Sequence, residues 1–390
     1  MKPLSPSLRL QLVVFALVSA SFTNVYLTQP VLPVLAEEFG AGMVLVSFSV
    51  SAVLFGIAIA NLPFGSLSDR YPIRPLISVG GAMVATGGLI VAATHSLPLL
   101  IAARFLQGLF IPALTTCLAA YLARSLPVER LNVVMGSYVS ATVVGGLGGR
   151  LLGGWIHPPL HWRFAFVSAA VFIIVATLVA LRWLSAQAAR SPTERAQAGY
   201  LQILGRRDLA PVFACAAGGF AVFSTVFNYL PFRLSEPVFG LSTGLITLIY
   251  CVYVVGIGMG PLAGRGANRY GSGPVILVGV AILLGSLLLL LVPHLAAVLA
   301  GLIGLCAGFF AIHAAAVGTL NRSLTSGHGR ANALYVLFYY GGGWLGITAA
   351  GVAYRYGGWQ GAVCLAGVFL LAPAIAGVVE LRTTRERIRS

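Results

Sequence analysis

Two arginines lie inside long apolar stretches of the chain, where a charged side chain is costly and is usually retained for a function. Arg104 lies in the apolar segment 98–122, and Arg150 follows a run of glycines in the segment 132–156. Two guanidinium groups at a comparable depth can bind an anionic group or organise a water-filled path. The alternative is structural: each arginine donates hydrogen bonds to carbonyls or extends its head group toward the outer interface.

Amide, phenol and indole side chains also occur inside apolar segments. Small-molecule sites combine apolar walls with a few placed polar groups, so these side chains are candidates for lining a cavity. The predicted cavity residues are Asn24, Tyr26, Gln29, Gln107, Arg150, Asn228, Tyr229, Tyr250, Tyr253, His313, Tyr335, Phe338, Tyr339 and Trp344. Taken singly, each is more often a helix-packing residue than a ligand contact.

The nine acidic residues all lie away from the middle of the apolar segments. A site for organic cations usually keeps a buried acid, whereas Asn24 holds the polar position of the first segment, which favours neutral or anionic ligands. If protons are involved, Glu37 and Glu38 are candidates to pair with Arg104 or Arg150. His313 can titrate near neutral pH, although a hydrogen-bonded packing role explains it equally well.

The composition indicates that the outer surface faces lipid. Hydrophobic residues make up 58% of the chain and charged residues 8%, whereas a soluble domain carries about 25% charged residues. The net charge of +15 does not indicate nucleic-acid binding, because the basic residues are scattered between apolar runs. The five cysteines are far apart in sequence, which argues against disulfides and against a metal site.

Segments long enough to cross a bilayer as helices need about 20 mainly apolar residues. Reading between charges and turn residues predicts twelve of them, at 10–34, 43–66, 74–94, 98–122, 132–156, 162–184, 209–231, 242–263, 273–292, 295–319, 331–352 and 358–381. The predicted domains are an N-terminal six-helix bundle (1–184), a cytoplasmic linker (185–208) and a C-terminal six-helix bundle (209–390).

Basic residues predict the orientation, because Lys and Arg favour the cytoplasmic side of a membrane. With the N-terminus inside and twelve spans, only Arg163, Arg233 and Arg355 fall on the outer side. The predicted fold is therefore an all-α integral membrane protein with both termini cytoplasmic.

An internal repeat divides the chain into two halves. The segment from Gly65 to Tyr71 matches the segment from Gly264 to Tyr270, about 200 positions later. Gly108 matches Gly308, Arg130 and Asn132 match Arg330 and Asn332, and Trp162 matches Trp359, in the same order and at nearly the same separation. Such agreement indicates a duplicated six-helix unit, and hence two pseudo-symmetric bundles.

Over essentially its whole length, the sequence resembles the major facilitator superfamily. The loop expected at 65–74 is similar to the family signature between helices two and three, and its echo carries Asn268 where an acid is common. Arg104 with Gln107 and Gly108 resembles the helix-four motif of proton-coupled members. The glycines at 145–149 resemble the helix-five motif of exporters, and the segment 24–33 is similar to helix one of the drug:proton antiporters.

The resemblance implies residues for coupling and gating: Gly65, Asp69, Arg70, Arg74, Arg104, Gly264, Asn268 and Arg269. An acid at the position of Asp69 can accept from backbone N–H groups and pair with an arginine, which would latch one conformation. A solvated loop that only follows the positive-inside rule is the alternative.

The expectation is a monomeric exporter of small organic molecules in the bacterial inner membrane. It is expected to work by alternating access as a proton-coupled antiporter, with the proton gradient as energy source and no cofactor. Uptake or exchange of a metabolite or organic anion is the alternative. An enzyme is a remote alternative, because the sequence has no His-Glu-x-x-His or G-x-S-x-G pattern. A non-transporting receptor is a remote alternative too, because no sizeable soluble domain is present to carry a signal.

Overall fold

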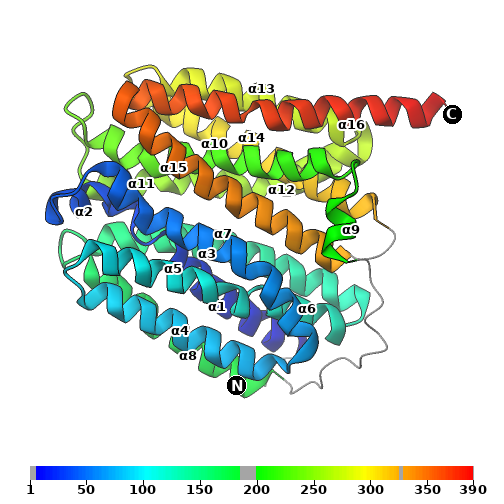
Figure 1. Cartoon of the computed structure of the whole chain (residues 1–390), viewed down its shortest axis with the longest axis horizontal. Coiled ribbons are helices and arrows are strands. Elements are labelled where there is room, and N and C mark those ends of the chain that lie inside the picture. Colours follow the sequence, from blue (N-terminus) through cyan, green and yellow to red (C-terminus); the bar gives the residue numbers. More distant parts are fainter. Residues whose placement is uncertain (1–5, 185–198, 325–327, 390) are drawn as a thin grey trace. The chain divides into compact units, whose positions relative to one another are not determined.

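A computed structural model describes residues 6–184, 199–324 and 328–389 of the protein. Within these ranges the regular elements are all helices, and the chain runs back and forth in long helices joined by short turns (Figure 1). The chain divides into two compact units. One comprises Met1–Ala41 with Ala52–Ala196, and the other Gly42–Ser51 with Gln197–Ser390, so the division falls inside one helix.

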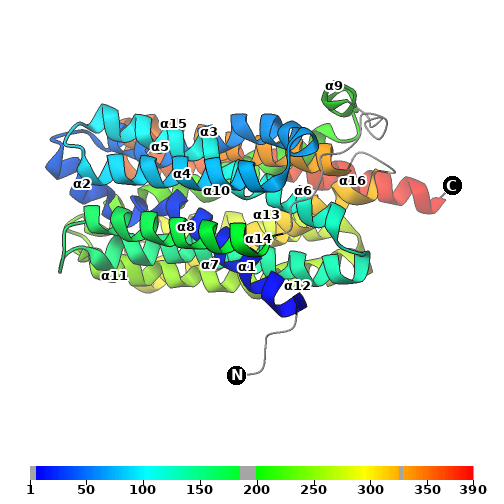
Figure 2. The ribbon, with the colours of Figure 1, turned by 90° about the horizontal axis from the view of Figure 1, so that it is seen from below.

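The first unit is built from the helices that precede residue 185. They are α1 (Pro6–Tyr26), the 3-10 turn η1 (Gln29–Val31), α2 (Leu32–Glu38), α3 (Met43–Arg70), α4 (Ile73–Ala93), α5 (Leu97–Leu114), α6 (Thr116–Ser125), α7 (Val128–Ile156) and α8 (Arg163–Trp183). α1 packs mainly on α7 and α8, and α4 packs on α5 and α8 (Figure 2). The first turns of α3 are grouped with the second unit.

The second unit repeats this plan. Its helices are α9 (Tyr200–Leu204), α10 (Ala210–Ser235), α11 (Thr243–Ile249), the 3-10 turn η3 (Tyr250–Val254), α12 (Val255–Tyr270), α13 (Ser272–Leu290), α14 (Leu295–Arg322), α15 (His328–Phe369) and α16 (Leu371–Arg389). Gly358, with φ of 57°, interrupts α15 and separates two spans. Of the predicted linker, residues 185–198 lie outside the described residues, and α9 lies in the remainder.

Each of the twelve predicted spans coincides with one or more of these helices. By length and composition alone, ten helices in the described part qualify as membrane spans. The count is lower because Gly329–Thr383 is taken as one segment, and because α7 is left out. Its many glycines and Arg150 lower the mean hydropathy of α7. The all-helical, multi-pass membrane fold is therefore confirmed.

The predicted loop at 65–74 is wrong for most of its residues. Gly65, Asp69 and Arg70 belong to α3, and Arg74 already belongs to α4. A short break at positions 71–72 separates the two helices, because Pro72 disfavours a helical conformation for the residue before it. The echo in the second unit is also helical, since Gly264, Asn268 and Arg269 lie in α12, which ends before Gly271 with φ of 88°.

The two units share details that the sequence repeat left open. Gly40 and Gly240, with φ of 55° and 57°, each turn the chain just before a long helical segment begins. These segments begin at Met43 in the first unit and at Thr243 in the second. A left-handed backbone conformation at both turns explains why glycine occupies both positions.

Backbone-to-backbone packing joins α7 to α1. A Cβ built on Gly145, Gly149 or Gly153 would meet the backbone carbonyls of Ser19, Thr23 and Leu27, respectively. The three glycines recur every four residues and form one stripe along α7, so the two helices approach without side chains between them. In the second unit, Gly342 and Gly346 of α15 face the backbone of α10 in the same way.

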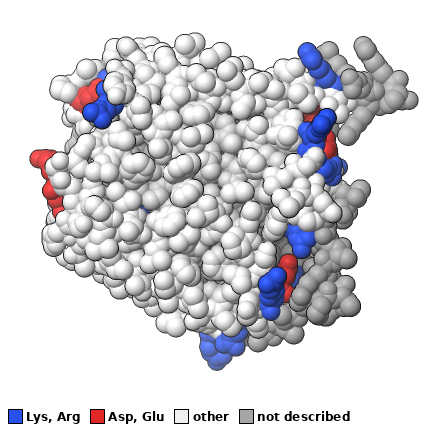
Figure 3. All heavy atoms as spheres, viewed as in Figure 1, with Lys and Arg blue, Asp and Glu red and all other residues white. Residues whose placement is uncertain are grey.

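The outer surface is apolar, as expected for helices in contact with lipid. Val171 and Leu178 of α8 are 56% and 60% exposed, and Leu288 of α13 is 60% exposed. The space-filling view shows a face that is uncharged over most of its area, with charged residues near its margins (Figure 3). Charges therefore gather near helix ends, as a membrane requires.

The glycine stripe of α7 gives a first prediction. Gly149→Ala places a methyl group against the Thr23 carbonyl and should lower the free energy of unfolding by about 1–3 kcal/mol, the usual cost of overpacking. Gly148→Ala is the matched control, because its Cβ would lie 3.7 Å from the Thr23 Oγ1 atom, an ordinary contact. Thermal unfolding in detergent measures both, and equal stability of the two variants would contradict the close approach.

Candidate functional site

The first membrane span is broken near its C-terminal end, and proline explains where. Pro30 has no backbone N–H, so the carbonyl of Tyr26, four residues earlier, has no α-helical donor from that position. α1 ends at Tyr26, and the chain continues through η1 into α2. In an apolar environment, the carbonyls released by such a break need other donors.

Arg104 of α5 supplies donors to the two carbonyls that precede that of Tyr26 at the end of α1. Its Nη1 donates to the carbonyl of Asn24 at 2.6 Å, and its Nη2 donates to the carbonyl of Val25 at 2.5 Å. The Arg104 side chain is fully buried, and its guanidinium also lies 5.4 Å from the centre of the Phe166 ring. The planar guanidinium thus binds two successive carbonyls at the end of α1, a geometry that a lysine cannot reproduce.

Gln107, one turn after Arg104, completes the cluster. Its Oε1 accepts from Arg104 Nη1 at 2.6 Å, and its Nε2 donates to the carbonyl of Val84 at 2.9 Å and to Asn24 Oδ1 at 3.3 Å. A Cβ on Gly87 of α4 would lie 2.6 Å from the Gln107 Cγ atom, so glycine makes room for this side chain. Asn24, Arg104 and Gln107, predicted separately, are therefore one hydrogen-bonded cluster among α1, α4 and α5.

Arg150 of α7 binds the other side of the same break. Its Nε donates to Gln29 Oε1 at 2.7 Å and its Nη1 to the carbonyl of Gly146 at 2.8 Å. The guanidinium lies over the Tyr26 ring at 3.9 Å from the ring centre, and 1% of the residue is exposed. Tyr26, Gln29 and Arg150 thus form a second cluster that holds η1 against α7.

In this structure, therefore, both buried guanidiniums bind the broken first span itself. Their partners include backbone carbonyls and side-chain amides, which agrees with the structural alternative considered for them. A transport role then requires that these bonds, or the position of the break, change during the cycle. The structure brings together six of the predicted residues in the first unit, in two clusters of three that each contain one arginine.

The expected pairing of Glu38 with Arg104 or Arg150 is wrong. Glu38 lies at the end of α2 and accepts from Arg163 Nη1 and from the Trp162 indole N–H at 2.5 Å. Arg163 begins α8 at that same end of the helices, so it is nearer than either buried arginine. Glu37 is exposed.

His157 lies close to Glu38 and His161. Burial and the neighbouring His161 lower the pKa of His157, and Glu38 opposes the shift. The lowered pKa favours the neutral form of His157 beside Glu38. A similar arrangement occurs in the second unit, where Glu236 accepts from Arg233 at 2.5 Å and from the Tyr354 hydroxyl at 2.6 Å.

An aromatic cluster occupies the middle of the second unit. His313 of α14 shares a hydrogen bond of 2.9 Å between its Nδ1 and the Tyr335 hydroxyl of α15. Tyr339, one turn after Tyr335, stacks on Phe220 with ring centres 3.8 Å apart, and its ring centre lies 5.1 Å from that of His313. The cluster continues through rings of α10, η3 and α14: Phe223, Phe227, Tyr253, Phe309 and Phe310.

Of the remaining predicted cavity residues, Tyr250 stacks on Phe227 at the edge of this cluster, with ring centres 5.8 Å apart. Tyr229 donates to the carbonyl of Ile347 and Tyr250 to that of Phe227, both at 3.0 Å, so each hydroxyl joins helices. Asn228 is fully buried and donates to Ser47 Oγ of α3 at 2.9 Å. Phe338 stacks on Phe213, and Trp344 lies in α15, partly exposed.

Asp69 pairs with an arginine that sequence analysis did not single out. Asp69 Oδ1 accepts from Arg124 Nη1 at 3.0 Å, and Arg124 Nη2 donates to the carbonyl of Ser68 at 2.9 Å. α6 thus holds the last turn of α3. Arg124 matches Arg322 about 200 positions later, and this was the signal in the sequence that could have identified it.

The other predicted gating residues have separate surroundings. Arg74 Nη2 donates to the carbonyl of Leu181 at 2.6 Å, at the end of α8, and Arg70 is exposed. In the second unit Asn268 is exposed, and Arg269 lies over the Tyr270 ring at 5.2 Å. There, Arg322 donates to the Ser272 hydroxyl, so the arginine is kept although an asparagine replaces the acid.

Comparison with known proteins identifies the class. The family model of the Major Facilitator Superfamily matches residues 14–326. The chain is 29% identical over 374 residues to the inner membrane transport protein YnfM of Escherichia coli, covering 95% of this chain and 90% of that protein. It is 26% identical over 367 residues to the MFS-type transporter YybF of Bacillus subtilis, covering 92% and 91%.

Solved structures show the same fold. A bacterial homologue of the human lysosomal transporter Spinster, in its inward-facing occupied conformation, aligns with a TM-score of 0.76 at 15% identity, covering 96% of each chain. The nucleoside transporter NupG aligns with a TM-score of 0.73 at 12% identity, covering 96% of this chain and 99% of that one.

The chain belongs to the Major Facilitator Superfamily, and it is a multi-pass membrane transporter rather than an enzyme. Its bacterial relatives include inner-membrane transport proteins, which agrees with the predicted location.

The Arg104 cluster gives a second prediction. Arg104→Ala removes the donors of two buried backbone carbonyls and of Gln107 Oε1, and each orphaned acceptor costs about 1–3 kcal/mol. The free energy of unfolding should therefore fall by about 3 kcal/mol or more, and Arg104→Lys should recover only part of it. Thermal unfolding in detergent measures the loss, with the exposed Arg355→Ala as control. Unchanged stability of Arg104→Ala would show that the α1 break does not depend on this guanidinium.

Proposed function

We propose that this transporter exports small organic molecules from the cell by proton-coupled antiport, exposing its binding site alternately to the two sides of the membrane. The observation that carries the proposal is the glycine-rich face of α7 packed on the broken α1. The exporter-like glycines Gly145 and Gly149 face the backbone of α1, and Arg104, of the helix-four motif, binds the end of that same helix. Both motifs thus contact one element, the first span.

Protons are the proposed coupling ion, and His313 is the proposed carrier. Among the described acids, Glu38, Asp69, Asp208 and Glu236 are paired with arginines at helix ends. His313, in contrast, lies in the middle of α14 and shares its hydrogen bond with Tyr335. When Nδ1 is unprotonated the Tyr335 hydroxyl donates to it; when Nδ1 is protonated it donates to the Tyr335 oxygen. Protonation therefore reverses the bond between α14 and α15.

The proposed substrates are neutral or anionic. In the described part, the middle of the spans holds arginines and no acid, so an organic cation would lack a partner there. Tyr335 is buried and Tyr339 stacks on Phe220, so a planar organic molecule would stack on these rings in a conformation that opens the cluster. Uptake or exchange of an organic anion uses the same features and is the second candidate. We further propose a monomer with both termini in the cytoplasm, since the basic residues favour that side.

Transport assays test the proposal. Expressed in an efflux-deficient host, the wild type should protect against toxic compounds that are neutral or anionic, and not against cationic ones. Added sensitivity instead of protection would favour uptake. A protected compound then serves in proteoliposomes with an imposed pH gradient. There, His313→Gln should lower gradient-driven transport at least about tenfold and leave substrate exchange without a gradient intact, because it removes one proton-transfer group.

The control for this variant is His294→Gln, an exposed histidine just before the same helix. It should transport like the wild type. Gradient-driven transport by His313→Gln at the wild-type rate would place the proton carrier elsewhere in the chain.

The Asp69–Arg124 pair gives a further prediction. Both side chains are partly exposed, so the pair contributes less than about 1 kcal/mol to stability. If the pair latches one conformation, Asp69→Asn and Arg124→Gln should each abolish transport while thermal stability and expression stay at wild-type levels. Asp208→Asn, which loosens the exposed pair with Arg206, should transport normally. Normal transport by Asp69→Asn would leave this pair without a part in switching.

A further inference from the structure

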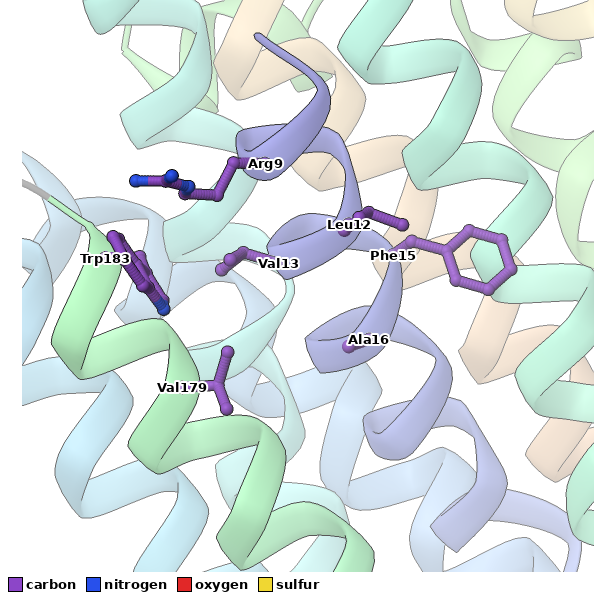
Figure 4. A pocket seen from close by; sticks show the side chains of 7 residues that line it. All are labelled: Arg9, Leu12, Val13, Phe15, Ala16, Val179 and Trp183. Carbon is purple, nitrogen blue, oxygen red and sulfur yellow. The ribbon is translucent and has the colours of Figure 1, made fainter. Parts of the chain in front are cut away.

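A groove opens on the surface of the first unit between α1 and α8. Its volume is 530 Å³, and Arg9, Leu12, Val13, Ala16, Val179 and Trp183 line it (Figure 4). The α1 residues follow one another at helical spacing on one face, with the basic residue at the start of the helix and the apolar residues after it. Leu12 is 50% and Trp183 is 47% exposed, so the groove is open to the outside of the bundle.

Two guanidinium groups surround the indole ring at the head of this groove. Arg9 Cζ lies 4.2 Å from the Trp183 ring centre, and Arg182 Cζ lies 5.5 Å from it. Stacking uses the face of a guanidinium, and its edge carries the N–H groups that donate to oxyanions. Two guanidinium groups beside one ring therefore create a local positive potential that attracts an anion.

A third arginine reduces the partial negative charge at the C-terminal end of α8, which also favours an anion there. The C-terminus of a helix carries partial negative charge, which disfavours anions. Here Arg74 of α4 donates to the carbonyl of Leu181 at 2.6 Å, next to Arg182, and offsets that charge. Guanidiniums from α1, α4 and α8 thus gather at this one corner of the unit, at the level where tryptophan marks a membrane interface.

We propose that this groove binds an anionic phospholipid as a specific, bound lipid. The phosphate lies at Arg9 and Arg182, and one acyl chain follows Leu12, Val13 and Val179 into the hydrocarbon region. The groove is basic where the two helices reach its head and apolar along the rest of its length. A phospholipid has the matching arrangement, with a charged headgroup followed by apolar acyl chains. A free phosphate would satisfy the guanidiniums and leave the apolar walls uncovered, so the lipid is the better occupant.

Native mass spectrometry of the delipidated full-length protein tests the proposal, with phosphatidylglycerol and phosphatidylcholine as probes. The wild type should retain one phosphatidylglycerol at least about fivefold more strongly than phosphatidylcholine, since each basic residue near an anionic lipid contributes about that factor. Arg9→Gln with Arg182→Gln should remove this preference. Arg355 also lies over an aromatic ring, with its Cζ 6.0 Å from the centre of the Tyr356 ring. Arg355→Gln is therefore the matched control and should keep the preference for phosphatidylglycerol.

A second variant tests the apolar part. Val179→Trp fills the groove and keeps both arginines, and it should also lose the retained lipid while thermal unfolding stays unchanged. Equal retention of the two lipids by the wild type would overturn the proposal. Full competition by glycerol 3-phosphate would do so too, because the headgroup alone would then account for binding. These outcomes do not depend on the transported substrate, so they are separable from the test of export.

Discussion

A buried guanidinium needs acceptors inside the protein, and a broken helix in a membrane needs donors. In this transporter the buried guanidinium donates to the carbonyls at the helix break, so each group satisfies the other. Arg104 donates to the carbonyls of Asn24 and Val25, which the break before Pro30 leaves at the end of α1. Because water is absent from the bilayer core, neither the break nor the arginine would be tolerated alone. The position of α1 within the first unit follows from this exchange.

The packing of the first unit supports the same element. The glycine stripe of α7 brings its backbone against α1, and Arg150 contacts Tyr26 at the end of α1 and Gln29 just past the break. α1 is therefore held by arginines from two helices, at two successive places.

The second unit solves the same architectural problem differently. α10, the counterpart of α1 and α2, continues without a break, and the 3-10 segment lies instead in the next span, at η3. Aromatic rings rather than arginines fill its middle, around His313 and Tyr335. The duplication thus preserves helix order, the turns at Gly40 and Gly240 and the glycine contacts, while the polar chemistry of the two units has diverged.

The sequence by itself determined the membrane fold. Span length, apolar composition and the repeat depend on the chain alone, because every residue in lipid must satisfy its backbone within a helix. It also identified Arg104 and Arg150 as exceptional, since an arginine inside a span is costly wherever it points. The sequence did not reveal that Tyr26, Gln29 and Asn24 would be the parts that these arginines bind.

Only the tertiary structure decided those partnerships, because hydrogen bonds between α1 and α5 join residues about 80 positions apart. For the same reason the sequence does not show that Glu38 binds Arg163, or that Arg124 is the partner of Asp69. Phe220 and Phe309 gave no signal at all, since an aromatic residue in an apolar run looks alike whether it faces lipid or a cluster. Which face of each helix meets which neighbour is a property of packing, and packing is set by the whole bundle.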